Sequence, residues 1–181
     1  MFTEGEATEP IYLNYWYRLH RDRVVVVIDE RHGAPMTLVT AAIAERKHQL
    51  AETKRGRGTG FDEYWCIFDV DEHPQLQRAI SLAEENEIRI ALSNPCIELW
   101  FVLHGEDQNA FIERDAIQRR CRALFGFDKR PSQEALETLH TTLPNGVRRA
   151  ASLDEMHFLN GSAVGSNPST KVPLLIESTV R

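Results

Sequence analysis

The chain has 181 residues, 42% of them hydrophobic, with a formal net charge of -6 and a pI near 5.7. This size favours a single domain over residues 1–181, and the acidic balance argues against a broadly basic nucleic-acid coat protein. No apolar stretch approaches the roughly 20 residues of a membrane span. The N-terminal sequence also lacks the basic start and apolar centre of a signal peptide. We therefore expect a cytoplasmic protein with no membrane partner.

The cysteines support the same compartment. Cys66, Cys96 and Cys121 are odd in number and form no CxxC pair. Two of them lie in apolar runs, where cysteine behaves as a small hydrophobe. This usage is typical of the reducing cytosol.

The first half of the chain predicts alternating strands and helices. A β-branched run at residues 24–28 is typical of a parallel strand that helices cover on both faces. The aromatic-rich run at 64–68 predicts a buried strand. In chain order we expect a helix over 8–19, a strand over 24–28, a helix over 35–52, a mobile basic loop over 53–60, a strand over 64–68, a helix over 74–86 and a strand over 88–92.

The second half is predominantly helical. We expect helices over 96–104, 109–124, 132–142 and 168–180, with a further short piece near 147–153. Two helix starts carry capping residues: Thr8 or Glu9 before a first-turn Pro10, and Asn94 before Pro95.

Alternation of strand and helix predicts right-handed crossovers and an open, mostly parallel sheet with helices on both faces. The fold class is therefore α/β and Rossmann-like, with the helical C-terminal half packed as an extension. In such folds functional sites gather at the carboxyl ends of the strands.

Acidic residues follow the strand expected at 64–68. Asp69 and Asp71 project from one face of an extended chain, with Cα atoms roughly 7 Å apart. At that separation two carboxylates repel by about 2 to 3 kcal/mol, and a divalent cation such as Mg²⁺ would relieve this repulsion. Alternatively, the two aspartates end the strand and cap the helix that starts near Pro74.

Glu4 is a third acidic candidate, near the start of the chain. Gly5 follows it, and the missing Cβ permits a tight turn or the close approach of a ligand. Glu4 would join Asp69 and Asp71 if it ended a neighbouring parallel strand. Otherwise Glu4 and Glu6 are solvated terminal charges.

Four segments together resemble the RloB-like family, whose genes lie near bacterial restriction and abortive-infection loci. They are EGEATEP at 4–10, YWCIFDVDEH at 64–73, LSNPCIELWFVLH at 92–104 and NPSTKV at 167–172. The resemblance runs essentially from end to end, and SNPC-x-ELW is the most specific motif. The chain departs from the family pattern at its start, where only three residues precede Glu4, so we expect either a short first strand or a misassigned start codon.

The RloB-like family in turn resembles the TOPRIM fold of topoisomerases, primases and OLD-type nucleases. This resemblance implies that Glu4 corresponds to the TOPRIM glutamate, and Asp69 and Asp71 to its DxD motif. It also implies that Asp69 and Asp71 hold Mg²⁺ or Mn²⁺, and that Glu4 is either a further metal ligand or a general acid or base in phosphoryl chemistry.

Further candidates flank this cluster. Glu98 falls in the first turn of the expected helix 96–104, where it either stabilises the helix dipole or adds a carboxylate to the cluster. His73 is either a proton-transfer residue or part of the turn before Pro74. His104 lies too far along its helix, so we expect a helix-end histidine there.

Basic residues gather in two groups, either as phosphate contacts or as solvated faces. One surrounds the expected loop (Arg46, Lys47, Lys54, Arg55 and Arg57), and the other lies in the helical half (Arg119, Arg120, Arg122, Lys129 and Arg130). Lys171 follows a Ser-Thr pair that would either bind a phosphate or cap a helix. We select Lys54, Arg55, Arg57 and Lys171 as candidate nucleic-acid contacts.

The sequence and its resemblance together favour one hypothesis. We expect a TOPRIM-like, Mg²⁺-dependent nuclease that acts on RNA, tRNA included, in antiphage defence linked to restriction, CRISPR or abortive-infection loci. Its catalytic residues would be Glu4, Asp69, Asp71, Glu98 and His73. The alternative is a non-catalytic partner or sensor that binds nucleic acid or another defence protein. Oligomerisation is compatible with either hypothesis.

Overall fold

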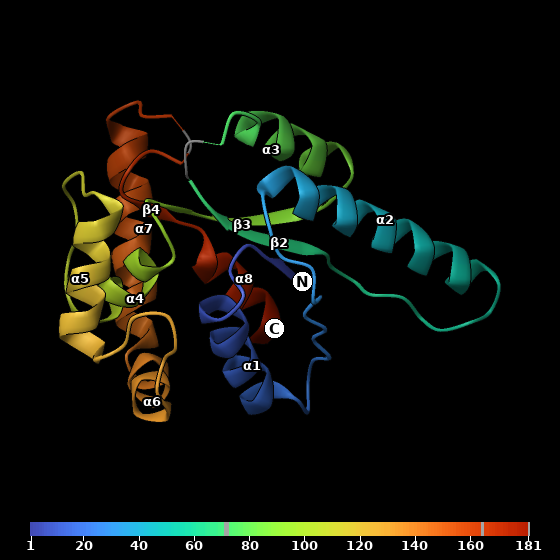
Figure 1. The fold of residues 1–181 in the computed structure, drawn as a ribbon, viewed down its shortest axis with the longest axis horizontal. Coiled ribbons are helices and arrows are strands. Elements are labelled where there is room, and N and C mark those ends of the chain that lie inside the picture. Colours follow the sequence, from blue (N-terminus) through green and yellow to red (C-terminus); the bar gives the residue numbers. More distant parts are fainter. Residues whose placement is uncertain (71–72, 164, 181) are drawn as a thin grey trace.

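The computed structural model describes residues 1–70, 73–163 and 165–180. Its centre is a four-stranded sheet in the order β1-β2-β3-β4 (Figure 1). The strands are β1 (Phe2–Thr3), β2 (Trp65–Asp69), β3 (Arg89–Asn94) and β4 (Ser169–Thr170). The first three are parallel to one another, whereas β4 runs antiparallel to β3.

Helices cover both faces of this sheet (Figure 1). They are α1 (Thr8–His20), α2 (Pro35–Lys54), α3 (Leu76–Glu85), α4 (Glu98–Gly105), α5 (Arg114–Phe125), α6 (Gln133–Thr141), α7 (Leu143–Leu159) and α8 (Val172–Val180). α2 and α3 lie on one face and α1 and α8 on the other, while α4 to α7 gather near the carboxyl ends of β2 and β3. This confirms the predicted α/β class, the mostly parallel sheet and the helical extension.

β2 explains why its sequence is apolar without interruption. Trp65 and Ile67 pack into the hydrophobic cluster of α1, α4 and α8, whereas Cys66 and Phe68 pack into the cluster of α2 and α3. Side chains alternate between the faces of a strand, so a strand buried on both faces needs apolar residues at every position. All three cysteines are buried free thiols, as predicted for the two that lie in apolar runs.

The prediction of a buried strand over residues 24–28 is wrong. Val25 is 74% exposed and Val27 52% exposed, and the segment has no regular secondary structure. It runs along the outer edge of β1, where the Met1 ammonium donates to the Val27 carbonyl (2.7 Å) and the Asp29 N–H donates to the Met1 carbonyl (2.8 Å). Because β1 has only two residues, it offers this segment only a short edge for pairing. The side chains of Val25 and Val27 are left exposed to solvent.

Both predicted caps also differ from the structure. α1 begins at Thr8, but its hydroxyl donates to the Lys129 carbonyl (2.9 Å) instead of capping the helix. Asn94 belongs to β3, where its amide donates to the Gly165 carbonyl (2.7 Å), and α4 begins only at Glu98. Both polar side chains therefore form long-range contacts that local sequence does not encode.

The helical half contains further differences. The piece expected near 147–153 is the centre of the longer α7, and the helix expected over 109–124 begins only at Arg114. The helix expected over 168–180 is preceded by β4, whose two residues are too few to leave a strand pattern in the sequence. No helix in the described ranges is both long and apolar enough to cross a bilayer.

Candidate functional site

β1 and β2 deliver Glu4 and Asp69 to the same edge of the sheet. The two strands are parallel, with Thr3 beside Ile67, and the Glu4 N–H continues the ladder by donating to the Ile67 carbonyl (3.0 Å). The Glu4 side chain then turns toward β2, where its Oε2 accepts the Asp69 N–H (3.0 Å). The short first strand thus suffices to bring these two predicted residues together.

His73 joins Glu4 at this edge. Its Nε2 lies 3.2 Å from Glu4 Oε1, and both side chains are partly exposed. The predicted site residue Asp71 lies outside the described residues. His104, by contrast, is buried between α4 and α7 next to Trp100, away from this cluster, as expected of a helix-end histidine.

Asp69 is a carboxylate held beside a cation in a buried position. Its Oδ2 accepts a hydrogen bond from the Arg114 guanidinium at 3.1 Å, and Arg114 also donates to the Pro95 carbonyl (3.4 Å). Burial raises the pKa of Asp69 well above its usual range, against the lowering effect of Arg114. The nearby carboxylates of Glu9, Glu98 and Glu4 raise this pKa further, so negative charge is concentrated here.

Glu9 is a buried carboxylate of the same cluster that the sequence analysis missed. Its Oε1 accepts the Gly5 N–H at 3.1 Å, and only 5% of the residue is exposed. A Cβ atom on Gly5 would lie 2.3 Å from Glu9 Oε2, so this approach requires glycine. Burial is the largest cause of the raised pKa of Glu9, and Glu98 and Glu4 contribute to it.

These side chains line one cavity of about 480 Å³ at the carboxyl ends of β1 and β2. Its acidic lining comes from Glu4, Glu6, Glu9, Asp69, Glu98 and Asp128, and its basic lining from Arg114, Lys129 and Arg130. The hydrogen bond from Thr8 to the Lys129 carbonyl ties the basic segment to the start of α1. A cavity with clustered carboxylates and a cationic rim suits a phosphate-containing ligand with an accompanying metal ion.

The donor set fits Mg²⁺ in kind. Mg²⁺ takes oxygen ligands and is commonly held by one or two carboxylates, with waters and substrate phosphate completing the shell. Glu4 and Asp69 both provide such oxygens to the lining of this cavity. Within residues 1–70, 73–163 and 165–180, however, no group of three His, Cys, Asp or Glu side chains is arranged to hold a metal.

The predicted nucleic-acid contacts do not gather at this cavity. Lys54 ends α2, whose 20 residues span about 30 Å. The other end of this helix begins at Pro35, which lines a small cavity together with His73. Arg55 and Arg57 are both paired with Glu52 at 2.9 and 2.8 Å. Lys171, which directly follows β4, is paired with Asp154 at 2.6 Å. Their contact with nucleic acid stays a prediction.

Sequence reasoning also missed Arg114. Arg114 opens α5, 45 positions after Asp69, and no local pattern distinguishes it from the other arginines of that helix. Glu9 did carry a signal, because it follows Glu4 and Gly5 within the same EGEATEP segment. One helical turn after a glycine is the spacing at which a side chain can reach back to that glycine's N–H.

Comparison with known proteins supports one assignment. A family model described as RloB-like protein matches residues 1–178. No curated protein and no solved structure matches the chain. Because the family match covers nearly the whole chain, including the strands and helices that form the carboxylate cavity, the protein belongs to the RloB-like family.

Proposed function

We propose that this protein is a Mg²⁺-dependent nuclease that acts on RNA in bacterial antiphage defence. The observation that carries the proposal is the meeting of Glu4, Glu9, Asp69 and Glu98 with Arg114 in one cavity. The RloB-like family is linked to restriction-type loci, which supports a defence role. The resemblance to the TOPRIM fold supports phosphoryl chemistry at the glutamate and aspartate positions.

The residues of the cavity suggest a division of roles. Glu4 is positioned to accept a proton from an attacking nucleophile, and His73, in contact with Glu4 Oε1, to share that proton. Asp69 with Glu4 would hold the metal, and a bound Mg²⁺ would supply Lewis-acid activation of the phosphodiester. Arg114, Lys129 and Arg130 would neutralise the phosphates of the substrate. Glu98 remains an auxiliary acid.

Substrate binding follows from the cationic rim. Lys129 and Arg130 are exposed residues that line the cavity. Lys54, Arg55 and Arg57, which the sequence suggested, lie at the C-terminal end of α2 and do not line it. Phosphate contacts contribute a salt-dependent term, with a slope near -0.7 per contact for single strands. Replacing Lys129 and Arg130 together by glutamine should reduce the log-log salt slope by about 1.4. The Lys54, Arg55 and Arg57 triple variant tests the competing prediction by the same measurement.

One observation favours a second candidate, a non-catalytic nucleic-acid-binding or sensor protein. Arg114 already occupies an oxygen of Asp69, and both oxygens of Glu4 have hydrogen-bond partners. In such a protein the arginine, rather than a metal, is the permanent counter-ion of Asp69. The two candidates therefore differ in whether the site needs a divalent cation.

The decisive experiment incubates the purified protein with total tRNA, single-stranded RNA and DNA in Mg²⁺, Mn²⁺ or EDTA. Glu4→Gln and Asp69→Asn preserve size while removing a charge from the cavity, so cleavage should fall by orders of magnitude. Asp62→Asn, at an exposed position before β2, is the matched control and should cleave like wild type. Cleavage that survives both cavity substitutions refutes this active site, and binding without cleavage in wild type favours the second candidate.

A further inference from the structure

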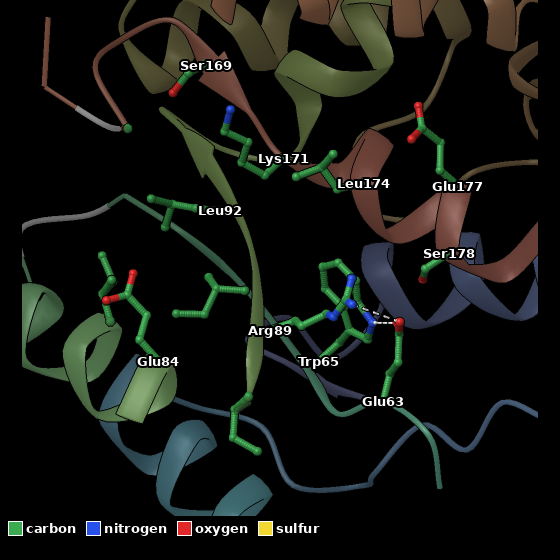
Figure 2. A pocket seen from close by; sticks show the side chains of 14 residues that line it. Glu63, Trp65, Glu84, Arg89, Leu92, Ser169, Lys171, Leu174, Glu177 and Ser178 are labelled. Atoms are coloured by element: carbon green, nitrogen blue, oxygen red, sulfur yellow. Dashed lines mark hydrogen bonds and ion pairs between the residues drawn. The ribbon is translucent and has the colours of Figure 1, made fainter. Parts of the chain in front are cut away.

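A second cavity lies along the outer edge of β3, between α3 and α8, and Figure 2 shows it facing the viewer. Its volume is about 570 Å³. Apolar side chains line it from three elements: Ile80 of α3, Ile90 and Leu92 of β3, and Leu174 of α8. We call this cavity the β3 groove. It shares no lining residue with the carboxylate cavity.

The sheet is open along this groove. β4 pairs with β3 only at Ser93 and Asn94, and one further backbone bond joins the Lys171 N–H to the Leu92 carbonyl (2.8 Å). Before Leu92, no strand of the described chain pairs with this edge of β3. A β-strand edge without a partner is a template for another extended chain.

The direction of the main chain places unpaired groups in the groove. The Arg89 N–H donates toward β2, to the Tyr64 carbonyl (2.8 Å), whereas the Leu92 carbonyl accepts on the outer side. Alternate residues of a strand direct their N–H and C=O groups to opposite edges, so the main chain of Ile90 faces the groove. A ligand whose hydrogen-bond donors and acceptors are spaced as in a β-strand would pair with the N–H and C=O groups of Ile90.

The charges of the groove are acidic. Its two cations already have partners: Arg89 is paired with Glu63 at 3.1 Å (Figure 2), and Lys171 with Asp154. Glu84 on α3 and Glu177 on α8 form no ion pair within the described ranges, and they stand on opposite sides of β3. A strand added to β3 would therefore pass between two uncompensated carboxylates.

We propose that the β3 groove binds an extended peptide segment of a partner protein, with apolar and basic side chains, which adds to β3 as a further strand. Main-chain hydrogen bonds to the open edge would provide affinity. Apolar side chains would cover Ile90 and the half-exposed Leu174, and lysine or arginine side chains would pair with Glu84 and Glu177. The open edge favours a peptide over a compact small molecule, because only an extended backbone matches its hydrogen-bond spacing.

The test begins with selection of peptides from a random phage-displayed dodecamer library on the full chain. We expect enriched sequences that combine Val, Ile or Leu with Lys or Arg. Synthetic versions are then titrated against Glu84→Lys, Leu174→Asp and the exposed control Glu85→Lys, which neighbours Glu84 but does not line the groove. Reversal at Glu84 should weaken binding about two- to fivefold, and Leu174→Asp at least tenfold, while Glu85→Lys should bind like wild type. N-methylation of alternate peptide nitrogens should abolish binding.

Several results would overturn the proposal. If selection on wild type enriches no peptide relative to selection on the Leu174→Asp protein, the groove binds no peptide. Peptides that bind Leu174→Asp as well as wild type, or that tolerate N-methylation in both registers, would mean another surface or another mode of binding. Self-association in light scattering that Leu174→Asp abolishes would identify a second copy of this chain as the occupant instead.

Discussion

Acidification should destabilise the protein through His104, a histidine that is only 1% exposed at the interface of α4 and α7. Burial lowers the pKa of His104 to about 3, and the neighbouring positive charge of Arg149 contributes. Arg149 donates to the main-chain carbonyls of Leu103 and His104. Between about pH 6.5 and pH 3, the ring is therefore neutral in the folded protein but protonated in the unfolded chain.

The direction of the effect follows from proton linkage. In the unfolded chain the histidine has a pKa of about 6.5, so below that pH the unfolded state binds a proton that the folded state does not. The contribution of the neutral His104 ring to the free energy of unfolding is therefore complete above pH 6.5, and it is lost as the pH falls toward 3. Each pH unit in this window removes up to about 1.4 kcal/mol, so pH 5 should lower the free energy of unfolding by about 2 kcal/mol.

Urea denaturation at pH 7.5 and pH 5 measures this loss. His104→Leu removes the titrating group, and although the substitution changes stability at both pH values, the loss between them should shrink by about 2 kcal/mol. His48→Gln, at an exposed position of α2, is the control and should keep the pH dependence of wild type. If wild type and His104→Leu lose the same free energy on acidification, His104 is not the origin of the effect.

Three further predictions concern the site and the core. Gly5→Ala should displace the Glu9 carboxylate and reduce cleavage tenfold or more, without loss of the folded circular-dichroism spectrum. Millimolar Mg²⁺ should raise the free energy of unfolding by about 1.4 kcal/mol for a Kd near 0.1 mM, and Asp69→Asn should remove this increase in thermal melts. Gly146→Ala should destabilise by about 1 to 3 kcal/mol in urea titrations, because its Cβ would lie 2.8 Å from a buried histidine ring, whereas Gly105→Ala should be nearly neutral.

The local sequence correctly predicted β2, a strand that is buried on both faces. The run that forms β2 is apolar at Trp65, Cys66, Ile67 and Phe68 because both faces of the strand are covered. Residues 24–28 are an equally uninterrupted apolar run, yet they lie at the edge of the sheet with Val25 exposed. The composition of a segment cannot distinguish these cases, because the number of layers that cover a strand is decided by the rest of the chain.

The candidate site was predictable in part for a similar reason. Glu4 and Asp69 end neighbouring parallel strands, so topology alone brings them to one edge. Arg114 reaches Asp69 from the start of α5, and the main chain at Lys129 is held in place because its carbonyl accepts a hydrogen bond from the Thr8 hydroxyl. Such contacts depend on how the helical half docks onto the sheet. No periodicity or spacing within either segment records that docking.

The charge balance at Asp69 links the fold to the two candidate functions. Burial and three neighbouring glutamates disfavour its ionised form, and Arg114 is the cation that opposes them. A divalent cation would act in the same direction with twice the charge, so it would relieve the repulsion that Arg114 only partly offsets. If Arg114 is replaced by methionine, a metal-binding site should show a larger stabilisation by Mg²⁺ than wild type. A site in which arginine is the permanent counter-ion should lose stability without gaining any response to Mg²⁺.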